Sequence, residues 1–172
     1  LAGLLKSTGV CGCPPLNANP RLVPNGAVYA IAQVGCTLYI GGSFSAIGPN
    51  TGGGAPLDMD AGALAPGLQT LLSINAHVRA VAPDDAGGWF IGGEFTKVGN
   101  TTRNRLARIN ADGTLHSWDP NANNIVYALA VSGETVYVGG LFTMLDGGTT
   151  RNRLAAIDTD VGLTSWNPNA DG

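Results

Sequence analysis

Charged residues are scarce in this sequence and long hydrophobic runs are missing, and both absences exclude classes of protein. Asp, Glu, Lys and Arg make up 12% of the 172 residues, and the formal net charge is −3. Nucleic-acid binding depends on clustered Lys and Arg that neutralise phosphates, so no nucleic-acid partner is predicted. No apolar stretch approaches the ~18 residues of a membrane-spanning helix, so no transmembrane segment is predicted either.

Helical periodicity and the common catalytic signatures are also missing. No long segment repeats apolar residues at the i, i+3, i+4 and i+7 positions of a helix. The sequence has no nucleophile elbow, phosphate-binding loop, dinucleotide fingerprint or zinc-protease motif. Short β-branched and aromatic runs bounded by turn residues are frequent instead, which predicts an all-β protein. Because the catalytic signatures are missing, we expect no enzymatic activity and no cofactor.

Glycine is abundant, at 26 of 172 residues, and its pairs mark a repeat. Gly-Gly pairs begin at Gly41, Gly92 and Gly139, which are 51 and 47 positions apart. Trp118 and Trp166 are separated by 48 positions. Periods of about 40–50 residues with four strands in each unit are typical of the blades of a β-propeller.

The second and third repeats each contain four short apolar runs separated by Gly, Asn and Asp, and the first repeat contains them in degraded form. The run before each Gly pair is apolar at every position, which is typical of a strand covered on both faces by neighbouring sheets. We therefore predict three four-stranded antiparallel propeller blades, at about residues 26–75, 76–123 and 124–172.

Three cysteines lie near the start of the sequence, at Cys11, Cys13 and Cys36. Cys11 and Cys13 are too close along the chain to bond to each other without strain. A disulfide from either one to Cys36 would attach residues 1–25, which we expect to form an irregular arm, to the first blade. The alternatives are three buried thiols or a metal site, and a Cys-x-Cys spacing without a second cysteine pair gives little support to the latter.

The second repeat carries a resemblance to a known family. Its segments are Asp84-Asp-Ala-Gly-Gly-Trp-Phe-Ile-Gly-Gly-Glu-Phe-Thr-Lys-Val-Gly99, Arg103-Asn-Arg-Leu-Ala-Arg-Ile-Asn-Ala-Asp-Gly113 and Trp118-Asp-Pro-Asn-Ala122. They resemble the delta-60 repeat, a β-propeller-like repeat of large bacterial secreted or cell-surface proteins. The resemblance extends over residues 26–172 and is loose in the first repeat, which lacks the Arg-Asn-Arg segment and the tryptophan. It implies a β-propeller in an extracellular or cell-surface setting, with no catalytic residues to assign.

Three blades are fewer than the ~4–8 of a closed propeller. An open stack would leave an apolar sheet face at each end, a larger patch than monomers normally expose. Because the sequence does not start with methionine, we expect first a piece of a longer propeller. The next alternatives are two chains that close a six-bladed ring as an isologous pair, and head-to-tail stacking into a filament. The expected partners are therefore other propeller blades or other protein chains.

An Asp-x-Asp-x-Gly spacing occurs at Asp58 and Asp60 and again at Asp158 and Asp160. Carboxylates two residues apart before a glycine can begin a calcium loop, because Ca²⁺ prefers oxygen ligands. No further acidic ligand follows at a suitable distance, so the favoured interpretation is a hairpin turn held by its own aspartates. These four residues are weak calcium candidates, and no metal site is predicted.

Loops that differ among the repeats are the best candidates for a contact surface, since binding usually resides in loops on a rigid scaffold. The longest such loop includes Ile47, Asn50 and Thr51 of the first repeat. Trp89 joins these candidates because no other repeat has tryptophan at its position, although an apolar strand favours a packing role. The repeated arginines and tryptophans are better explained as structural, since they recur in equivalent places.

Together these patterns predict a non-catalytic extracellular or cell-surface β-propeller module with a structural or protein-interaction role in a larger assembly. The alternative is a carbohydrate-binding propeller, with or without calcium, which would need an exposed tryptophan or tyrosine beside the aspartate turns. An enzyme would need polar groups converging on the central channel, and the first strands of the repeats offer almost none.

Overall fold

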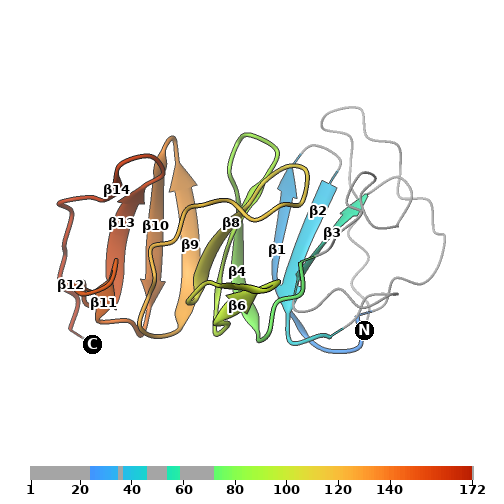
Figure 1. Cartoon of the computed structure of the whole chain (residues 1–172), viewed down its shortest axis with the longest axis horizontal. Coiled ribbons are helices and arrows are strands. Elements are labelled where there is room, and N and C mark those ends of the chain that lie inside the picture. The colour runs from blue at the N-terminus through green and yellow to red at the C-terminus, as the bar shows by residue number, and fades with distance from the viewer. Residues whose placement is uncertain (1–23, 35–36, 46–53, 59–71, 172) are drawn as a thin grey trace.

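In the computed structural model every regular element is a β-strand over the residues it describes, which are 24–34, 37–45, 54–58 and 72–171. Three antiparallel sheets stand side by side along the molecule, and none of the described sheets is closed (Figure 1). The predicted all-β class with open propeller blades is confirmed. None of the described segments forms a helix long and apolar enough to cross a membrane.

The three sheets are formed one after another along the chain. The first sheet contains β1 (Val28–Val34), β2 (Thr37–Gly42) and β3 (Gly54–Asp58). The second contains β4 (Val78–Pro83), β5 (Trp89–Gly93) and β8 (Leu106–Ile109). The third contains β9 (Val126–Ser132), β10 (Thr135–Gly140), β13 (Leu154–Asp158) and β14 (Gly162–Leu163). Two small hairpins pair β6 (Lys97–Val98) with β7 (Thr101–Thr102), and β11 (Met144–Leu145) with β12 (Thr149–Thr150).

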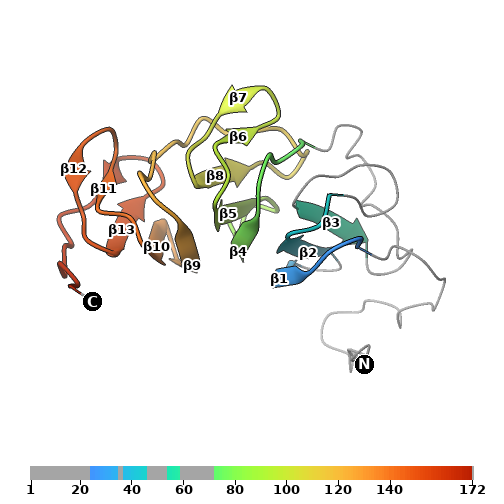
Figure 2. The ribbon, with the colours of Figure 1, turned by 90° about the horizontal axis from the view of Figure 1, so that it is seen from below.

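The three sheets form an arc with β1, β4 and β9 along its inner side and the two hairpins on its outer side (Figure 2). In the second and third predicted blades the fourth strand is short. It has two residues in the third sheet and shrinks to a single bridge between Ile109 and Leu115 in the second. Pro120 and Pro168 follow soon after, and proline has no N–H with which to extend a ladder.

Packing between sheets, rather than within them, makes the hydrophobic core. The residues of β5 are buried at all five positions, because the strand is covered on both faces as its apolar run predicts. Side chains alternate along a strand, so Trp89 points to Tyr39 of the first sheet and Phe90 points to the third sheet. Each of the two core clusters therefore joins two neighbouring sheets.

The two glycines of each Gly-Gly pair permit two different close approaches. A Cβ atom on the second glycine, at Gly42, Gly93 or Gly140, would overlap a backbone carbonyl oxygen of its own repeat. At Gly42 that oxygen belongs to Ala27, in the linker that enters β1. The second glycine therefore lets the chain entering each blade lie against the end of the second strand.

The first glycine of each pair makes room for the next sheet. A Cβ on Gly41 would lie 2.5 Å from Cγ1 of Val78, and a Cβ on Gly92 would lie 2.7 Å from Cγ1 of Val126. Both valines begin the inner strand of the following sheet and are fully buried. We call this packing of a valine against a glycine of the preceding sheet the valine–glycine contact.

An asparagine ahead of each inner strand ties the entering linker to the end of its hairpin. In the second repeat Asn75 Oδ1 accepts hydrogen bonds from the N–H groups of Thr96 and Lys97, both at 2.9 Å. Its Nδ2 donates to Thr96 Oγ1 at 2.9 Å. Asn25 and Asn123 make matching bonds in the first and third repeats, so the linkers are fixed in the same way each time.

Substituting the first glycine of a pair tests the valine–glycine contact. Gly92→Ala is expected to lower the free energy of unfolding by about 1–3 kcal/mol, the usual cost of overpacking, because the new methyl would overlap Val126. Gly139→Ala is the matched control, since its methyl would meet nothing closer than Leu154 Cδ2 at 3.4 Å. Urea denaturation at low protein concentration measures both, and equal losses would contradict the contact.

Candidate interaction site

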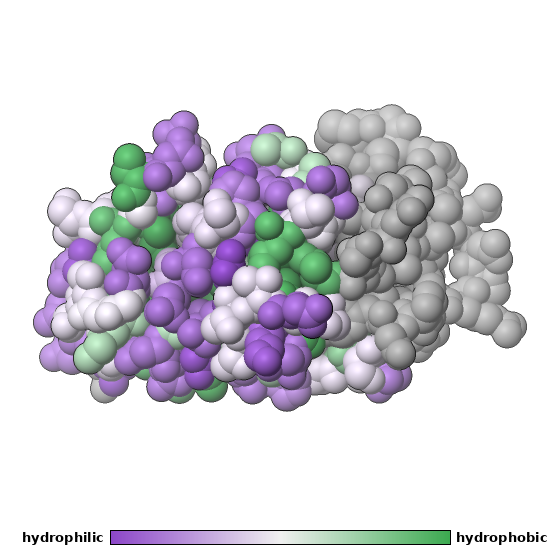
Figure 3. Space-filling model, viewed as in Figure 1, coloured by the Kyte–Doolittle hydropathy of each residue, from purple (hydrophilic) through white to green (hydrophobic). Residues whose placement is uncertain are grey.

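The face of the third sheet that points away from the second sheet exposes large apolar side chains, and we call it the end face. It consists of Tyr137, Gly139, Leu154 and Trp166. The side chains of Tyr137, Leu154 and Trp166 are 41, 38 and 44% exposed. In the view of Figure 3 the third sheet lies at the left end of the molecule, and hydrophobic residues are visible on the side that faces the viewer.

Equivalent positions in the second sheet are covered. Phe90, Leu106 and Trp118 are 1, 0 and 8% exposed, and all three belong to the cluster that packs against the third sheet. The inner strands show the same difference in exposure. Ala80 and Ala82 of β4 are buried, whereas Ala128 and Ala130 of β9 are exposed. The end face is therefore a blade-to-blade surface that no described residue covers.

The aromatic side chains of the end face already hold the arrangement found inside the stack. The rings of Phe90 and Trp118 meet edge to face with centroids 5.0 Å apart. The rings of Tyr137 and Trp166 meet in the same manner at 5.6 Å. Such edge-to-face pairs are stabilising in their own right, so the surface is preorganised before any partner binds.

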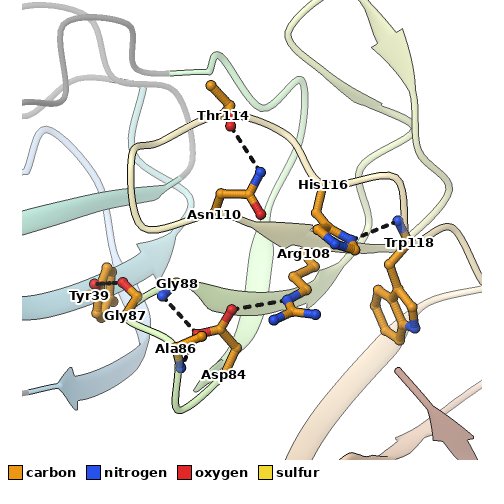
Figure 4. Close-up of polar contacts among 10 residues, drawn as sticks. All are labelled: Tyr39, Asp84, Ala86, Gly87, Gly88, Arg108, Asn110, Thr114, His116 and Trp118. Atoms are coloured by element: carbon orange, nitrogen blue, oxygen red, sulfur yellow. Dashed lines mark hydrogen bonds and ion pairs between the residues drawn. The ribbon is translucent and has the colours of Figure 1, made fainter. Parts of the chain in front are cut away.

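Trp89, a candidate contact residue from the sequence, is buried against the first sheet. Its ring lies 4.4 Å from that of Tyr39, centroid to centroid. The hydroxyl of Tyr39 donates a hydrogen bond of 3.0 Å to the carbonyl oxygen of Gly87 in the turn before β5 (Figure 4). A ligand would reach the indole of Trp89 only by separating the first two sheets, so in this structure Trp89 is a packing residue.

The turn that Tyr39 reaches is fixed by a buried carboxylate (Figure 4). Asp84 Oδ1 accepts the N–H groups of Ala86 and Gly88 at 2.9 and 2.7 Å. Its Oδ2 accepts from Nε of Arg108 at 2.9 Å, and the guanidinium lies over the ring of Phe90. This network gives the first sheet a rigid surface on which to pack.

The aspartate turns of the third and second repeats bind their own backbone. Asp158 Oδ1 accepts the N–H groups of Val161 and Asp160 at 3.0 and 2.9 Å, and these bonds hold the pKa of its carboxyl below the usual value. Asp112 accepts the N–H and the hydroxyl of Thr114. Over the described ranges no three His, Cys, Asp or Glu side chains gather closely enough to hold a metal ion.

The remaining sequence candidates cannot be placed. Nothing is described for the side chain of Asp58, nor for Asp60, Cys11, Cys13, Cys36, Ile47, Asn50 and Thr51, which lie outside the described residues.

The repeated arginines bind backbone oxygens of their own blades. Arg103 Nη2 donates to the carbonyl oxygen of His116 at 3.2 Å. Arg151 Nη2 donates to that of Thr164 at 2.7 Å, in the same place one repeat later. These side chains connect the third strand of a blade to its last segment, which agrees with a structural role for the Arg-Asn-Arg motif.

A charged cluster on the inner side of the arc was not anticipated from the sequence. Each inner strand has a β-bulge just after its first valine, at the positions of Tyr29, Arg79 and Tyr127. Arg79 Nε donates to Glu94 Oε1 at 2.8 Å, and its guanidinium lies 4.5 Å over the ring of Tyr29. His77 Nδ1 lies 3.4 Å from Glu94 Oε2.

Arg79 is a charged residue of the first strand of the second repeat, β4. The register shifts between Val78 and Ala80, so the alternation of side chains along β4 is interrupted at Arg79. The hydrogen bond from Arg79 holds the pKa of the Glu94 carboxyl below its usual value. Because Arg79 stacks on Tyr29 of the first sheet, the cluster links two blades.

Removing the Tyr39 hydroxyl tests its bond between the first two sheets. Tyr39→Phe leaves the Gly87 carbonyl oxygen without its donor, and we expect a loss of about 1 kcal/mol in unfolding free energy. Tyr137→Phe alters the equivalent position on the exposed end face and should change nothing. Thermal unfolding followed by circular dichroism measures both, and a Tyr39→Phe variant with the Tm of the wild type would show that the hydroxyl contact contributes no stability.

The comparisons with known proteins agree with this architecture. A family model described as a β-propeller domain of unknown function (DUF5122) matches residues 87–115. The match runs from the turn before β5 to Leu115, which includes the Gly-Gly pair and the Arg-Asn-Arg segment of the second repeat. No curated protein matches the chain. The second repeat is thus similar to a β-propeller repeat, and the match does not distinguish delta-60 repeats from other repeats of this kind.

Proposed function

We propose that this chain is a non-catalytic β-propeller module that acts by protein contact, with the end face as its contact surface. The observation that carries the proposal is the exposure of Tyr137, Leu154 and Trp166 at positions whose counterparts in the second sheet are buried. Clustered exposed apolar side chains are typical of interaction sites. Tyrosine and tryptophan also supply much of the binding energy at protein interfaces.

The ion pairs support a structural role rather than catalysis. Arg79 pairs with Glu94, and Arg108 pairs with the buried carboxylate of Asp84. Each pair joins residues of the second repeat, and none of the four residues lines the described pocket that includes Trp118 and Leu163. Catalytic groups are typically strongly perturbed residues that lie in a cleft, so we propose a structural function for both pairs.

A secreted or cell-surface location, in a protein of the delta-60 type, is part of the same proposal. It is supported by the low charge content and by the resemblance of the second and third repeats. The predicted disulfide from Cys11 or Cys13 to Cys36 also belongs here, because structural disulfides form in oxidising compartments.

Carbohydrate binding is the alternative function, and it would need an exposed aromatic residue such as Trp166. Its counterpart Trp118 is buried between two sheets. The exposure of Trp166 therefore follows from its place at the end of the stack, and needs no sugar to explain it. We favour protein contact for this reason.

A charge on the end face tests the proposed function. Leu154→Asp should weaken self-association of the chain at least tenfold, because the carboxylate would be buried in an apolar interface. Val161→Asp is the control, since Val161 is almost fully exposed in the turn before β14. Sedimentation velocity over a hundredfold range of concentration gives the association constants.

The wild-type chain and Val161→Asp are expected to associate as concentration rises, and Leu154→Asp is expected to remain a single chain. Equal association constants for both variants would show that the end face does not form the contact. A wild-type chain that stays single at every concentration would contradict self-association through this face.

A further inference from the structure

Neighbouring sheets in this molecule are joined by unlike surfaces. Val78 packs against Gly41 and Val126 packs against Gly92, so each contact brings a valine of one sheet to a glycine of the sheet before it. Both valines are fully buried. A stack built by this rule has two different ends, one that presents a glycine and one that presents a valine.

The glycine end is Gly139, at the centre of the end face. Gly139 pairs with Ala128 of β9, as Gly92 pairs with Ala80 of β4, so the two glycines hold the same register. A Cβ on Gly139 would meet only its own sheet, at 3.4 Å from Leu154 and farther from its other neighbours. No described residue fills, at Gly139, the space that Val126 occupies at Gly92.

The valine end is Val28, at the start of β1. Val28 pairs with Gly42 in the first sheet as Val78 pairs with Gly93 in the second. Val28 is nevertheless 38% exposed, whereas Val78 is 0% exposed. Both inner strands carry the same bulge directly after the valine, so the two side chains leave their sheets in equivalent places.

Side chains around Gly139 repeat the surroundings of Gly92. Phe90, Leu106 and Trp118 form the apolar wall against which the third sheet packs. Tyr137, Leu154 and Trp166 stand at the same positions on the end face. A sheet that presents a valine in the manner of Val126 would therefore find both the space and the apolar wall that Val126 finds within the chain.

We propose that the end face binds a second copy of this chain head to tail, with Val28 of that copy packed against Gly139. This inference rests on the proposed contact function of the end face and names its partner. Each junction joins the glycine end of one copy to the valine end of the other. Two copies joined at both ends would have six blades, within the range of ~4–8 found in closed propellers.

Two variants that each block one side of the junction test the proposal. Val28→Asp places a charge at the valine end and leaves the end face intact. Gly139→Val fills the space on the end face and leaves Val28 intact. Each variant alone should associate at least tenfold more weakly than the wild type, because every junction between identical chains then has one defective side.

An equimolar mixture of the two variants is the decisive sample. In the mixture, Val28 of the Gly139→Val chain can pack against Gly139 of the Val28→Asp chain. The association constant of this junction should be within about threefold of the wild-type value. Association should stop at one-to-one pairs, because each pair has no second intact junction. A fluorescent label on the Val28→Asp chain lets sedimentation follow the mixed pairs alone. Circular dichroism confirms that each variant is folded, and Gly139→Ala replaces Gly139→Val if the larger side chain unfolds the sheet.

The outcomes separate the partner from the function. If Val28→Asp associates as strongly as the wild type while Leu154→Asp does not, end faces pair with each other, so this inference fails and the proposed contact function stands. If folded variants fail to recover association when mixed, the head-to-tail junction is wrong. If the wild-type chain does not associate at any concentration, both the inference and self-association through the end face fail.

Discussion

The packing of a valine against a glycine of the preceding sheet is the contact on which this stack of blades depends. Val78 and Val126 are fully buried only because Gly41 and Gly92 have no side chain in their path. The contact sets how closely the inner strands approach. Aromatic and aliphatic side chains farther out, such as Phe90, then fill the space that remains between two sheets.

A core built between sheets makes each blade depend on its neighbours. A single sheet cannot bury both of its faces, so β5 is covered completely whereas β10, at the end of the stack, alternates between buried and exposed residues. Hydrogen bonds such as Tyr39 to Gly87, and the stacking of Arg79 on Tyr29, add specificity to the first junction. The exposed end face follows from the same architecture, and the proposed function uses the surface that holds the blades together.

The sequence predicts the architecture well because periodicity and glycine placement are local patterns. The Gly-Gly spacing and the continuous apolar run before it are sufficient for an open stack of β-blades. Contacts between distant residues cannot be predicted in this way: the burial of Trp89 depends on Tyr39 of another sheet, and Arg79 stacks on Tyr29 of another sheet from a bulge. The recurrence of Asn25, Asn75 and Asn123 ahead of each inner strand was a usable signal for the linker bonds. Trp166 is exposed because its sheet is at the end of the stack. The repeat pattern does not predict this exposure, because it makes Trp166 equivalent to the buried Trp118.

The most direct measurement of the central contact is a double-mutant cycle between Gly92 and Val126. The cycle compares the unfolding free energy lost on Gly92→Ala in the wild-type chain with the loss in a Val126→Ala chain. The Val126→Ala chain lacks Cγ1, the methyl group that the new Cβ would overlap. Strong coupling, of about 1 kcal/mol or more, is expected because the second substitution makes room for the first. Costs that add to within about 0.5 kcal/mol would mean that the two residues act independently, and would contradict the valine–glycine contact as the basis of blade stacking.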